Sequence, residues 1–362
     1  MGFMRPAQII TSIALGVGAI APLGWALKLR KDLHEREEHI TALLNQLQRV
    51  YELPEVSTAL QVPGHIGVVM NPHKEELVEV LAAVRHAAYL LGVESVEHYP
   101  TQEDDPGVQA SRDALNDGAS LVIAAGGDGT VRAVAEALVD TEADLGIIPV
   151  GTGNLLARNL NLPYNDIERC VGLALQGTTR AIDTIDLTVE RTDESVLTST
   201  FVVIAGAGID AEIMSDTRDG IKQAAGWLAY GEAGMRKLPG KRKPIWVSID
   251  DQPARRSKVR SVMIANCGML QGGIRMVPHA SIYDGLLDVM LLAPRNLWDW
   301  ARVALNAISK NHAPLRAVDT MQGQKCVIEL AEPMISQQDG DATGTARRIT
   351  ATVNPGSLRV RC

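Results

Sequence analysis

This sequence lacks closely spaced cysteine pairs, an excess of basic residues and two common phosphate-binding signatures. Its 4 Cys residues form no C-x-x-C pair, which argues against a zinc site or a disulfide framework and favours a reducing, cytoplasmic compartment for the globular body. The formal net charge is −8, so we expect no nucleic-acid partner. Neither the G-x-x-x-x-G-K-[ST] loop nor the protein-kinase motif set is present.

Charge is also absent from residues 7–27, a run long enough to cross a bilayer as a helix. The basic residues that follow this run are Lys28, Arg30, Lys31 and Arg36. By the positive-inside rule they place the rest of the chain in the cytoplasm. We therefore expect a single-pass membrane anchor over residues 1–30, with a signal sequence and a buried soluble helix as the alternatives.

Residues 31–62 are predicted to form a juxtamembrane helix followed by a linker. Apolar residues recur at helical spacing between residues 40 and 47, and prolines with a glycine between residues 53 and 64 indicate the linker. Pairing with a second copy in a homodimer, lying on a lipid surface and packing on the globular body all remain open for the helix.

The length of 362 residues predicts two domains. Over residues 63–178 short apolar runs alternate with amphipathic runs, which is typical of a doubly wound parallel sheet covered by helices. The runs predicted as strands are residues 66–70, 93–99, 121–125 and 145–150. Ligands of such sheets bind beyond the carboxyl ends of the strands.

Over residues 179–362 apolar and alternating runs follow one another, and only two helical stretches, near residues 211–238 and 297–309, interrupt them. This pattern predicts a second, largely antiparallel β-sandwich domain that binds the lipid, with a C-terminal strand free to return to the first domain. We expect the active site in the interdomain cleft.

A glycine-rich turn, GGDGT at Gly126–Thr130, joins the predicted strand 121–125 to an amphipathic run. Glycines let the backbone approach a ligand closely, and a helix N-terminus suits phosphate. The carboxylate of Asp128 is out of place in a simple anion site, but it suits a divalent metal or a reacting hydroxyl beside the phosphates. A plain strand-to-helix connection is the alternative.

Polar residues stand where each predicted strand ends. They are Asn71, Thr101, Asp128 and Thr152. The carboxyl ends of parallel strands share one edge of the sheet, so these four side chains are expected to converge there.

Further motifs follow the glycine-rich turn in a fixed order: PVGTGN at 149–154, IAN at 264–266, GG at 272–273, PHASIYDGLLD at 278–288 and QDGD at 338–341. This ordered set resembles the diacylglycerol kinase catalytic-domain family, which includes bacterial lipid kinases and the sphingosine and ceramide kinases. The resemblance covers about residues 65–362.

The resemblance implies that ATP binds along the glycine-rich turn and the neighbouring strand ends. The residues that it assigns to the nucleotide are Asn71, Thr101, Gly126, Gly127, Asp128, Gly129, Thr130, Val131, Arg132, Thr152, Gly153 and Asn154. It also implies a structural Mg²⁺ site at Ser281, Asp284 and Leu286, in which Asp284 supplies its side chain and the other two residues their carbonyls.

Asp339-Gly340-Asp341 resembles the aspartate-glycine-glutamate motif of the family, which holds the proposed general base. The third residue is shortened here by one methylene, which lowers its reach and favours Asp339 over Asp341 as the base. We keep both, with Asp128, as catalytic candidates.

For the lipid substrate the resemblance implies Asp183, with Asp186 as a competing match, and the small residues Gly206 and Gly208 at the entry to the lipid cleft. Solvated strand residues and a β-bulge are the alternatives.

Together these features predict a membrane-anchored kinase that uses ATP and Mg²⁺ to phosphorylate the hydroxyl of diacylglycerol or a related lipid alcohol. A carboxylate would accept the proton of that hydroxyl. An NAD kinase-like enzyme and a non-catalytic lipid-binding protein on the same fold are the rival readings.

Overall fold

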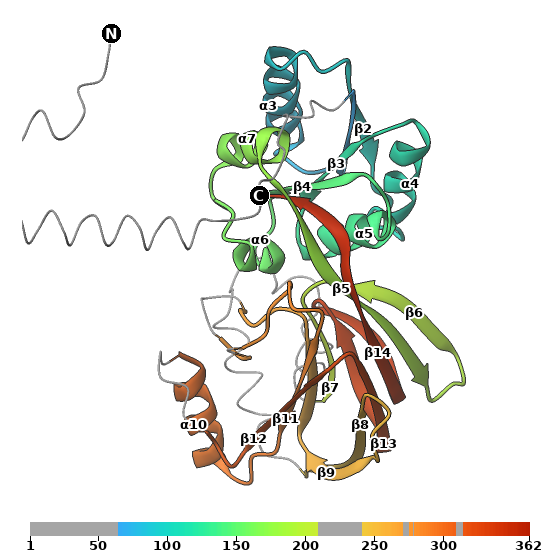
Figure 1. Ribbon diagram of the computed structural model, residues 1–362, viewed down its shortest axis with the longest axis vertical. Coiled ribbons are helices and arrows are strands. Elements are labelled where there is room, and N and C mark those ends of the chain that lie inside the picture. Colours follow the sequence, from blue (N-terminus) through green and yellow to red (C-terminus); the bar gives the residue numbers. More distant parts are fainter. Residues whose placement is uncertain (1–63, 209–240, 271–274, 278, 309–313) are drawn as a thin grey trace, which may run out of the picture. The chain divides into compact units, whose positions relative to one another are not determined.

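The computed structural model describes residues 64–208, 241–270, 275–277, 279–308 and 314–362 (Figure 1). All of them belong to one compact unit, Leu60–Cys362. The expected helix at 211–238 and the segments 1–30 and 31–62 lie outside the described residues.

The first lobe contains a parallel sheet with the spatial order β4-β3-β1-β2. Its strands are β1 (His65–Met70), β2 (Ser95–Pro100), β3 (Leu121–Gly126) and β4 (Asp144–Pro149). Strands β3 and β4 are buried along their whole length, because helices cover both faces of a parallel sheet. The α/β architecture predicted for this part of the chain is therefore confirmed.

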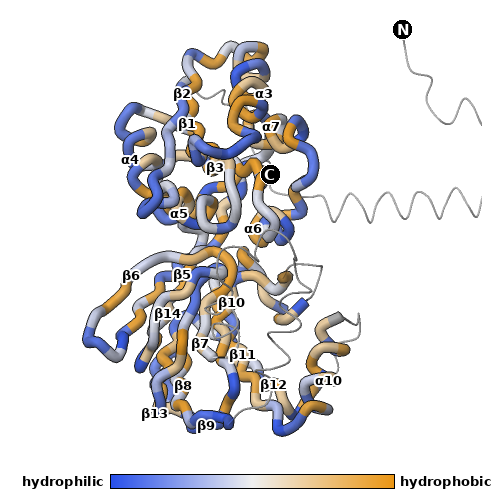
Figure 2. The backbone as a smooth tube through the Cα atoms, turned by 180° about the vertical axis from the view of Figure 1, so that it is seen from behind, coloured by the Kyte–Doolittle hydropathy of each residue, from blue (hydrophilic) through white to orange (hydrophobic). Residues whose placement is uncertain are grey.

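Helices α3 (Leu77–Leu90) and α7 (Ile167–Gln176) share one hydrophobic cluster, in which Val84 and Ala174 meet the sheet. Figure 2 shows apolar segments on both of these helices. Helices α4 (Val108–Asn116) and α5 (Asp128–Leu138) belong to another cluster. The helices therefore cover the two faces of the sheet in pairs.

The second lobe is built from strands paired in antiparallel fashion. They are β5 (Thr179–Arg191), β6 (Val196–Phe201), β7 (Ile204–Gly208), β8 (Lys243–Ile249), β9 (Arg255–Val259), β10 (Ser261–Ala265), β11 (Leu287–Leu292), β12 (Val318–Gly323), β13 (Lys325–Gln338) and β14 (Asp341–Arg361). Helix α10 (Leu297–Ile308) follows β11. The short helix α6 (Leu155–Asn159) follows β4.

Strands β13 and β14 have 14 and 21 residues, and β14 joins the two lobes. The register of β13 shifts between Glu329 and Met334, so its first half pairs with β8 and its last residues pair with β7. At its far end β14 pairs with β4 in parallel, Val360 opposite Leu145. The separate sheets expected for the two domains are thus parts of one mixed sheet.

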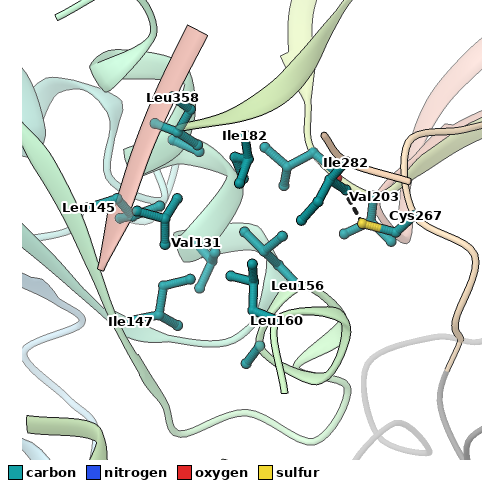
Figure 3. Close-up of a cluster of buried hydrophobic side chains, with 14 of the residues drawn as sticks. Val131, Leu145, Ile147, Leu156, Leu160, Ile182, Val203, Cys267, Ile282 and Leu358 are labelled. Atoms are coloured by element: carbon teal, nitrogen blue, oxygen red, sulfur yellow. Dashed lines mark hydrogen bonds between the residues drawn. The ribbon is translucent and has the colours of Figure 1, made fainter. Parts of the chain in front are cut away.

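One hydrophobic cluster extends from the first lobe into the second. Figure 3 shows Val131 and Leu156 close to Ile182, with Val203 and Ile282 further along the same cluster. A second cluster fills the interior of the β lobe and includes Phe201 and Ile264. Because apolar side chains pack directly between the lobes, burial of this surface fixes the position of the polar groups beside it.

A buried ion cluster ties the end of the chain to the first lobe. The carboxylate of Asp144 accepts hydrogen bonds from Arg361 Nε at 2.8 Å, Arg359 Nε at 2.9 Å and Thr179 Oγ1 at 2.8 Å. Burial alone would raise the pKa of Asp144, but these donors hold it below its ordinary value. The cluster therefore holds β14 and β5 against β4.

Asp144→Asn is expected to destabilise the protein by about 3–5 kcal/mol near neutral pH, because it leaves a buried guanidinium without its counter-ion. A lowered folded-state pKa contributes stability above the unfolded-state pKa and loses it as pH falls. The difference in thermal unfolding between the two proteins should therefore shrink below about pH 4. Asp251→Asn, which removes an exposed pair with Lys325, is the control and should cost less than about 1 kcal/mol. An equal loss in both variants would contradict the role of the cluster.

The single-pass membrane location predicted from residues 7–27 is corrected. Throughout the described part of the chain, no helix is both long enough and apolar enough to cross a membrane. Residues 7–27 lie outside that part, and we withdraw the membrane location.

Candidate active site

The GGDGT turn connects β3 to α5 and leaves no room for a larger residue at its first position, Gly126. A Cβ at Gly126 would lie 2.5 Å from Cβ of Thr130, so the chain turns back on itself as α5 begins at Asp128. The first N–H groups of α5 have no partner within the helix and carry its positive dipole end. The turn therefore offers the backbone surface that a phosphate group requires.

A second glycine-containing loop, residues 151–154, packs against this turn. A Cβ at Gly151 would lie 2.6 Å from Cα of Gly127, and a Cβ at Gly153 would lie 2.2 Å from Oδ2 of Asp128. Asn154 has a φ of 50°, and its Nδ2 donates to the carbonyl of Gly151 at 2.7 Å. The two loops, which are 20 residues or more apart in sequence, form a single site because β3 and β4 are neighbours.

Asp128 joins these loops. Its Oδ1 accepts a hydrogen bond from the N–H of Leu155 at 2.6 Å. Burial raises the pKa of Asp128, while N–H groups of Leu155 and Asn154 and the charge of Arg158 act in the opposite direction. A half-buried carboxylate beside a helix N-terminus is suited to hold a cation or to orient a hydroxyl.

Asn154 is buried, and within the described residues its Oδ1 has no hydrogen-bond partner. This oxygen lies in the loop that contacts Asp128. A buried acceptor without a donor is costly, so Asn154 fits the ligand-binding role that the sequence predicted. Thr152, in the same loop, is exposed.

Asn71 and Thr101 follow β1 and β2, and β1 pairs with both β2 and β3. Asn71 is exposed, and its Oδ1 accepts the N–H of His73 at 2.9 Å. Thr101 is 9% exposed and its N–H donates to the carbonyl of Met70. These residues lie along the sheet edge that carries Asp128, and their nucleotide contacts stay predictions.

Asp339 lies in the turn between β13 and β14, with a φ of 46°. Its carboxylate accepts three backbone hydrogen bonds: Val202 N–H at 3.2 Å, Val203 N–H at 3.1 Å and Ile204 N–H at 2.8 Å. Burial nevertheless raises the pKa of Asp339 to about 6, although the N–H donors and the charge of Arg132 act to lower it. The side chain anchors the turn to the start of β7.

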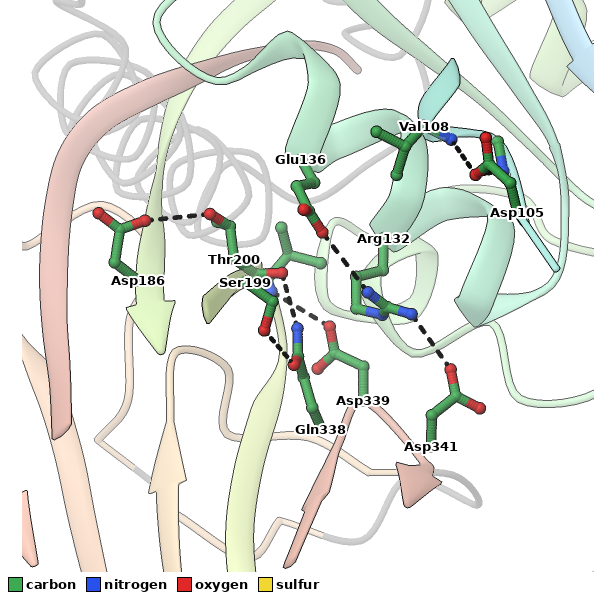
Figure 4. A network of polar contacts seen from close by, with 12 residues as sticks. Asp105, Val108, Arg132, Glu136, Asp186, Ser199, Thr200, Gln338, Asp339 and Asp341 are labelled. Carbon is green, nitrogen blue, oxygen red and sulfur yellow. Dashed lines mark hydrogen bonds and ion pairs between the residues drawn. The ribbon is translucent and has the colours of Figure 1, made fainter. Parts of the chain in front are cut away.

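Asp341 lies two residues further on, and its environment is different. Its side chain is 56% exposed, and its Oδ2 pairs with Nη2 of Arg132 at 3.3 Å. A Cβ at Gly129 would lie 3.7 Å from the same oxygen. Asp341 therefore reaches the glycine-rich turn from the opposite lobe, and Figure 4 shows its carboxylate directed toward Arg132.

The expected metal loop, 281–288, brings two carboxylates together. Oδ1 of Asp284 accepts a hydrogen bond from the N–H of Leu286 at 3.1 Å, and its Oδ2 accepts a hydrogen bond from Nε2 of Gln322 at 3.3 Å. Asp288 is 5% exposed, and burial together with the charge of Asp284 raises its pKa to about 6. The sequence did not assign Asp288, although its place four residues after Asp284 in one motif was a usable signal.

The oxygen atoms of this loop fit a hard cation. Among the described residues Oδ2 of Asp288 is buried without a partner, and a carboxylate pair with this charge suits Mg²⁺. No cluster of three or more His, Cys, Asp or Glu residues that could hold a metal occurs in the described part. The carbonyl ligands expected from Ser281 and Leu286 stay predictions.

The lipid-binding candidates in β5 and β7 have packing roles in this structure. Asp183 is 3% exposed and accepts the N–H of Gly285 at 2.7 Å and of Gly356 at 2.8 Å. A Cβ at Gly206 or Gly208 would lie 2.4 Å from a carbonyl oxygen of the segment around β10. Asp183 thus joins the metal loop to β14, and the glycines let β7 approach β10; their substrate contacts stay predictions.

A cavity of about 300 Å³ lies in the second lobe, between α10 and strands β11 and β12. Its apolar lining residues are Met276, Met290, Leu292, Val303, Ala307, Pro314, Leu315 and Val318. Its polar lining residues are Arg275, His279, Asn306, Asp319 and Thr320. The sequence did not indicate this cavity, because its walls come from segments separated along the chain.

The structure therefore brings together Gly126–Arg132, residues 151–154 and Asp341, with Asp339 directly behind. Asp183, Gly206 and Gly208 lie apart from them as packing residues, and the metal loop forms a separate cluster. The contact between Arg132 and Asp341 joins residues 209 apart in sequence, so no local pattern could have predicted it.

Comparison with known proteins gives a consistent result. Residues 65–187 match the diacylglycerol kinase catalytic domain, and residues 203–362 match the YegS C-terminal NAD kinase beta sandwich-like domain. A diacylglycerol kinase of Bacillus subtilis is 31% identical over 286 residues, covering 76% of this chain and 89% of the relative. A "Probable lipid kinase YegS-like" protein of Stenotrophomonas maltophilia is 33% identical over 269 residues, covering 72% and 84%.

A solved structure of a diacylglycerol kinase from Bacillus anthracis superposes with a TM-score of 0.66 at 18% identity. It covers 83% of this chain and 97% of that structure. At this level of identity the likeness concerns the fold.

Proposed function

This chain belongs to the diacylglycerol kinase catalytic-domain family of lipid kinases, and from that premise we propose that it transfers the γ-phosphoryl group of ATP to the hydroxyl of diacylglycerol or a related lipid alcohol. Membership of the family supports ATP-dependent kinase activity. The observation that carries the finer proposal is the approach of Asp341, from the second lobe, to the turn at Gly129.

The chain's own residues divide the work of phosphoryl transfer. The N–H groups at the start of α5 and the packed loop 151–154 bind the phosphates. Asp128 orients the reacting groups, and bound Mg²⁺ would spread the negative charge that develops on the phosphoryl oxygens. Asp341 accepts the proton of the lipid hydroxyl at Oδ1 or Oδ2.

The geometry supports Asp341 rather than Asp339 as the base. The carboxylate of Asp339 accepts the backbone N–H groups of residues 202–204, which turns it toward the β lobe. Asp341 is exposed beside the glycine-rich turn. The argument from side-chain length that favoured Asp339 is therefore outweighed by accessibility.

Incubation of the purified full-length chain with labelled ATP, Mg²⁺ and a panel of lipid alcohols, beside NAD, tests this function. We expect label in the lipid and none in NAD, and loss of the product when Mg²⁺ is omitted. Labelled NADP without any phosphorylated lipid would show an NAD kinase-like enzyme. No labelled product with any acceptor would favour a lipid-binding protein without catalysis.

The cavity under α10 is proposed to hold an acyl chain of the substrate. Its volume lies at the lower end of the range for small-molecule pockets, and its lining is mostly apolar. Ala307→Phe fills the cavity from α10, and we expect the KM for a long-chain diacylglycerol to rise about tenfold while the KM for a short-chain analogue changes little. Ala304→Phe, at an exposed position of the same helix, is the matched control. Equal effects on both chain lengths would place the acyl chain elsewhere.

A further inference from the structure

The guanidinium of Arg132 lies between two carboxylates from different lobes (Figure 4). Its Nη2 is 3.3 Å from Oδ2 of Asp341, and its Nη1 is 3.6 Å from Oε2 of Glu136. The Arg132 side chain is only 15% exposed. Burial of this kind fixes the position of the group and strengthens its interaction with nearby charges.

Glu136 directs the guanidinium toward the second lobe. It lies one turn after Arg132 on α5 and also accepts the backbone N–H of Thr200. Burial raises the pKa of Glu136, and the charge of Arg132 acts in the opposite direction. Glu136 therefore holds one side of the guanidinium and leaves the other side for Asp341.

The short side chain of Asp341 depends on the guanidinium of Arg132 for its position more than a glutamate side chain would. It is one methylene shorter than the glutamate at the corresponding place of the aspartate-glycine-glutamate motif, and it is 56% exposed. It also follows two residues with positive φ, Asp339 and Gly340. The ion pair with Arg132 draws its carboxylate toward Gly129.

The charge of this cluster does not suit a phosphate ligand. One guanidinium against two carboxylates leaves the group of Arg132, Glu136 and Asp341 with a formal charge of −1 when all three are ionised. A triphosphate that approached the terminal nitrogens of Arg132 would have to displace these carboxylates, whereas Nε of Arg132 is buried without a partner among the described residues. The nucleotide contact expected of Arg132 stays a prediction, and its ion pair with Asp341 indicates a further role.

We propose that Arg132 is a positioning residue, which aims the shortened carboxylate of Asp341 at the lipid hydroxyl. The proposal rests on the proposed kinase function, because it assigns the base of that reaction. It explains how an aspartate can serve at a place where one methylene of reach is missing. The positive charge of Arg132 draws the shorter carboxylate toward the glycine-rich turn.

Arg132→Gln in the full chain separates this role from phosphate binding. We expect kcat for the lipid alcohol to fall tenfold or more, since misplacement of a catalytic group by about 1 Å costs up to about 100-fold. The ATP dissociation constant, measured by calorimetry, should change less than about twofold. Arg132→Lys, which keeps the charge but loses the fork that spans both carboxylates, should also lower kcat.

A double variant that restores the length of the acidic side chain is the decisive part of the experiment. In Arg132→Gln combined with Asp341→Glu, we expect kcat to recover to within about threefold of the wild type, because the longer carboxylate no longer needs the guanidinium. Arg347→Gln, which breaks an exposed pair with Glu190, is the matched control and should leave kcat unchanged. A purely structural role for Arg132 would lower the melting temperature without rescue by glutamate.

An activity-free measurement keeps the proposal separate from the kinase function. A double-mutant cycle of Arg132→Gln and Asp341→Asn on thermal unfolding should be non-additive if the two side chains interact in solution. Additive effects would overturn the proposal even in an inactive protein. A tenfold weaker ATP affinity of Arg132→Gln, or the absence of rescue in an active enzyme, would overturn it as well. Failure of the wild type to phosphorylate any lipid alcohol would instead overturn the kinase function.

Discussion

Asp128→Asn is expected to lower the rate of lipid phosphorylation by a factor on the order of 100 to 1,000, which is the size of effect that removing one well-placed electrostatic group has on a transfer reaction. The substitution removes the negative charge at the start of α5 and retains an oxygen that can accept the N–H of Leu155. Turnover of a short-chain lipid alcohol with labelled ATP measures the loss, and the melting temperature should change little.

Asp128→Ala is the informative companion, because it also deletes the acceptor of the Leu155 N–H. An unsatisfied donor in a half-buried loop costs about 1–3 kcal/mol, so the alanine variant should be both inactive and less stable. The loss of stability is expected because Asp128 links the two glycine-containing loops. An asparagine variant that kept most of its activity would contradict the role of the Asp128 charge.

Asp341→Asn is expected to lower kcat by about 100- to 10,000-fold, the range that a general base contributes. The KM for ATP should stay nearly constant, because the carboxylate acts on the lipid hydroxyl and not on the phosphates. Single-turnover kinetics with saturating ATP separate chemistry from product release. Since the side chain is 56% exposed, little loss of stability is expected.

Asp339→Asn provides the contrast that identifies the base. One amide oxygen cannot replace a carboxylate that accepts N–H groups from Val202, Val203 and Ile204. This variant should therefore lose thermal stability as well as activity, because the turn before Asp341 is released from β7. If Asp339→Asn abolished turnover with an unchanged melting temperature while Asp341→Asn remained active, the assignment of the base would be reversed.

The part of the fold that sequence predicted well is local in origin. Apolar runs such as 121–125 have no alternative to a buried strand, and the alternation of strands and helices leads to a parallel sheet whose ends share one edge. The neighbourhood of the turn at Gly126–Thr130 and the loop 151–154 followed from this rule. The strand β9, by contrast, was missed, because its exposed Arg255, Arg256 and Lys258 give no apolar signal; charged side chains of this kind are common on edge strands.

The candidate site was predictable in part. The glycine-rich turn could be named from residue types and spacing, and the acidic motif at 339–341 was named through its resemblance to the family motif. The different roles of Asp339 and Asp341 could not be predicted, because they depend on the N–H groups of residues 202–204, of which only Ile204 belongs to β7, and on one guanidinium of α5. Likewise, the hydrogen bonds by which the Asp183 carboxylate joins two turns, at Gly285 and Gly356, could not be predicted, and its substrate contact stays a prediction.

Residue order alone determined which elements of this protein form and where its glycine-rich turns lie, since hydrophobic periodicity and glycine conformation act over a few neighbouring residues. The tertiary structure decided which acidic group faces the glycine-rich turn, because the positions of Asp339 and Asp341 depend on how β13 and β14 pack against α5. Contacts such as that between Arg132 and Asp341 join residues 209 apart. They form only when burial of the apolar cluster around Val131 and Val203 has brought the two lobes together. Because the hydrophobic effect is non-directional, the sequence pattern does not show which apolar surfaces will meet.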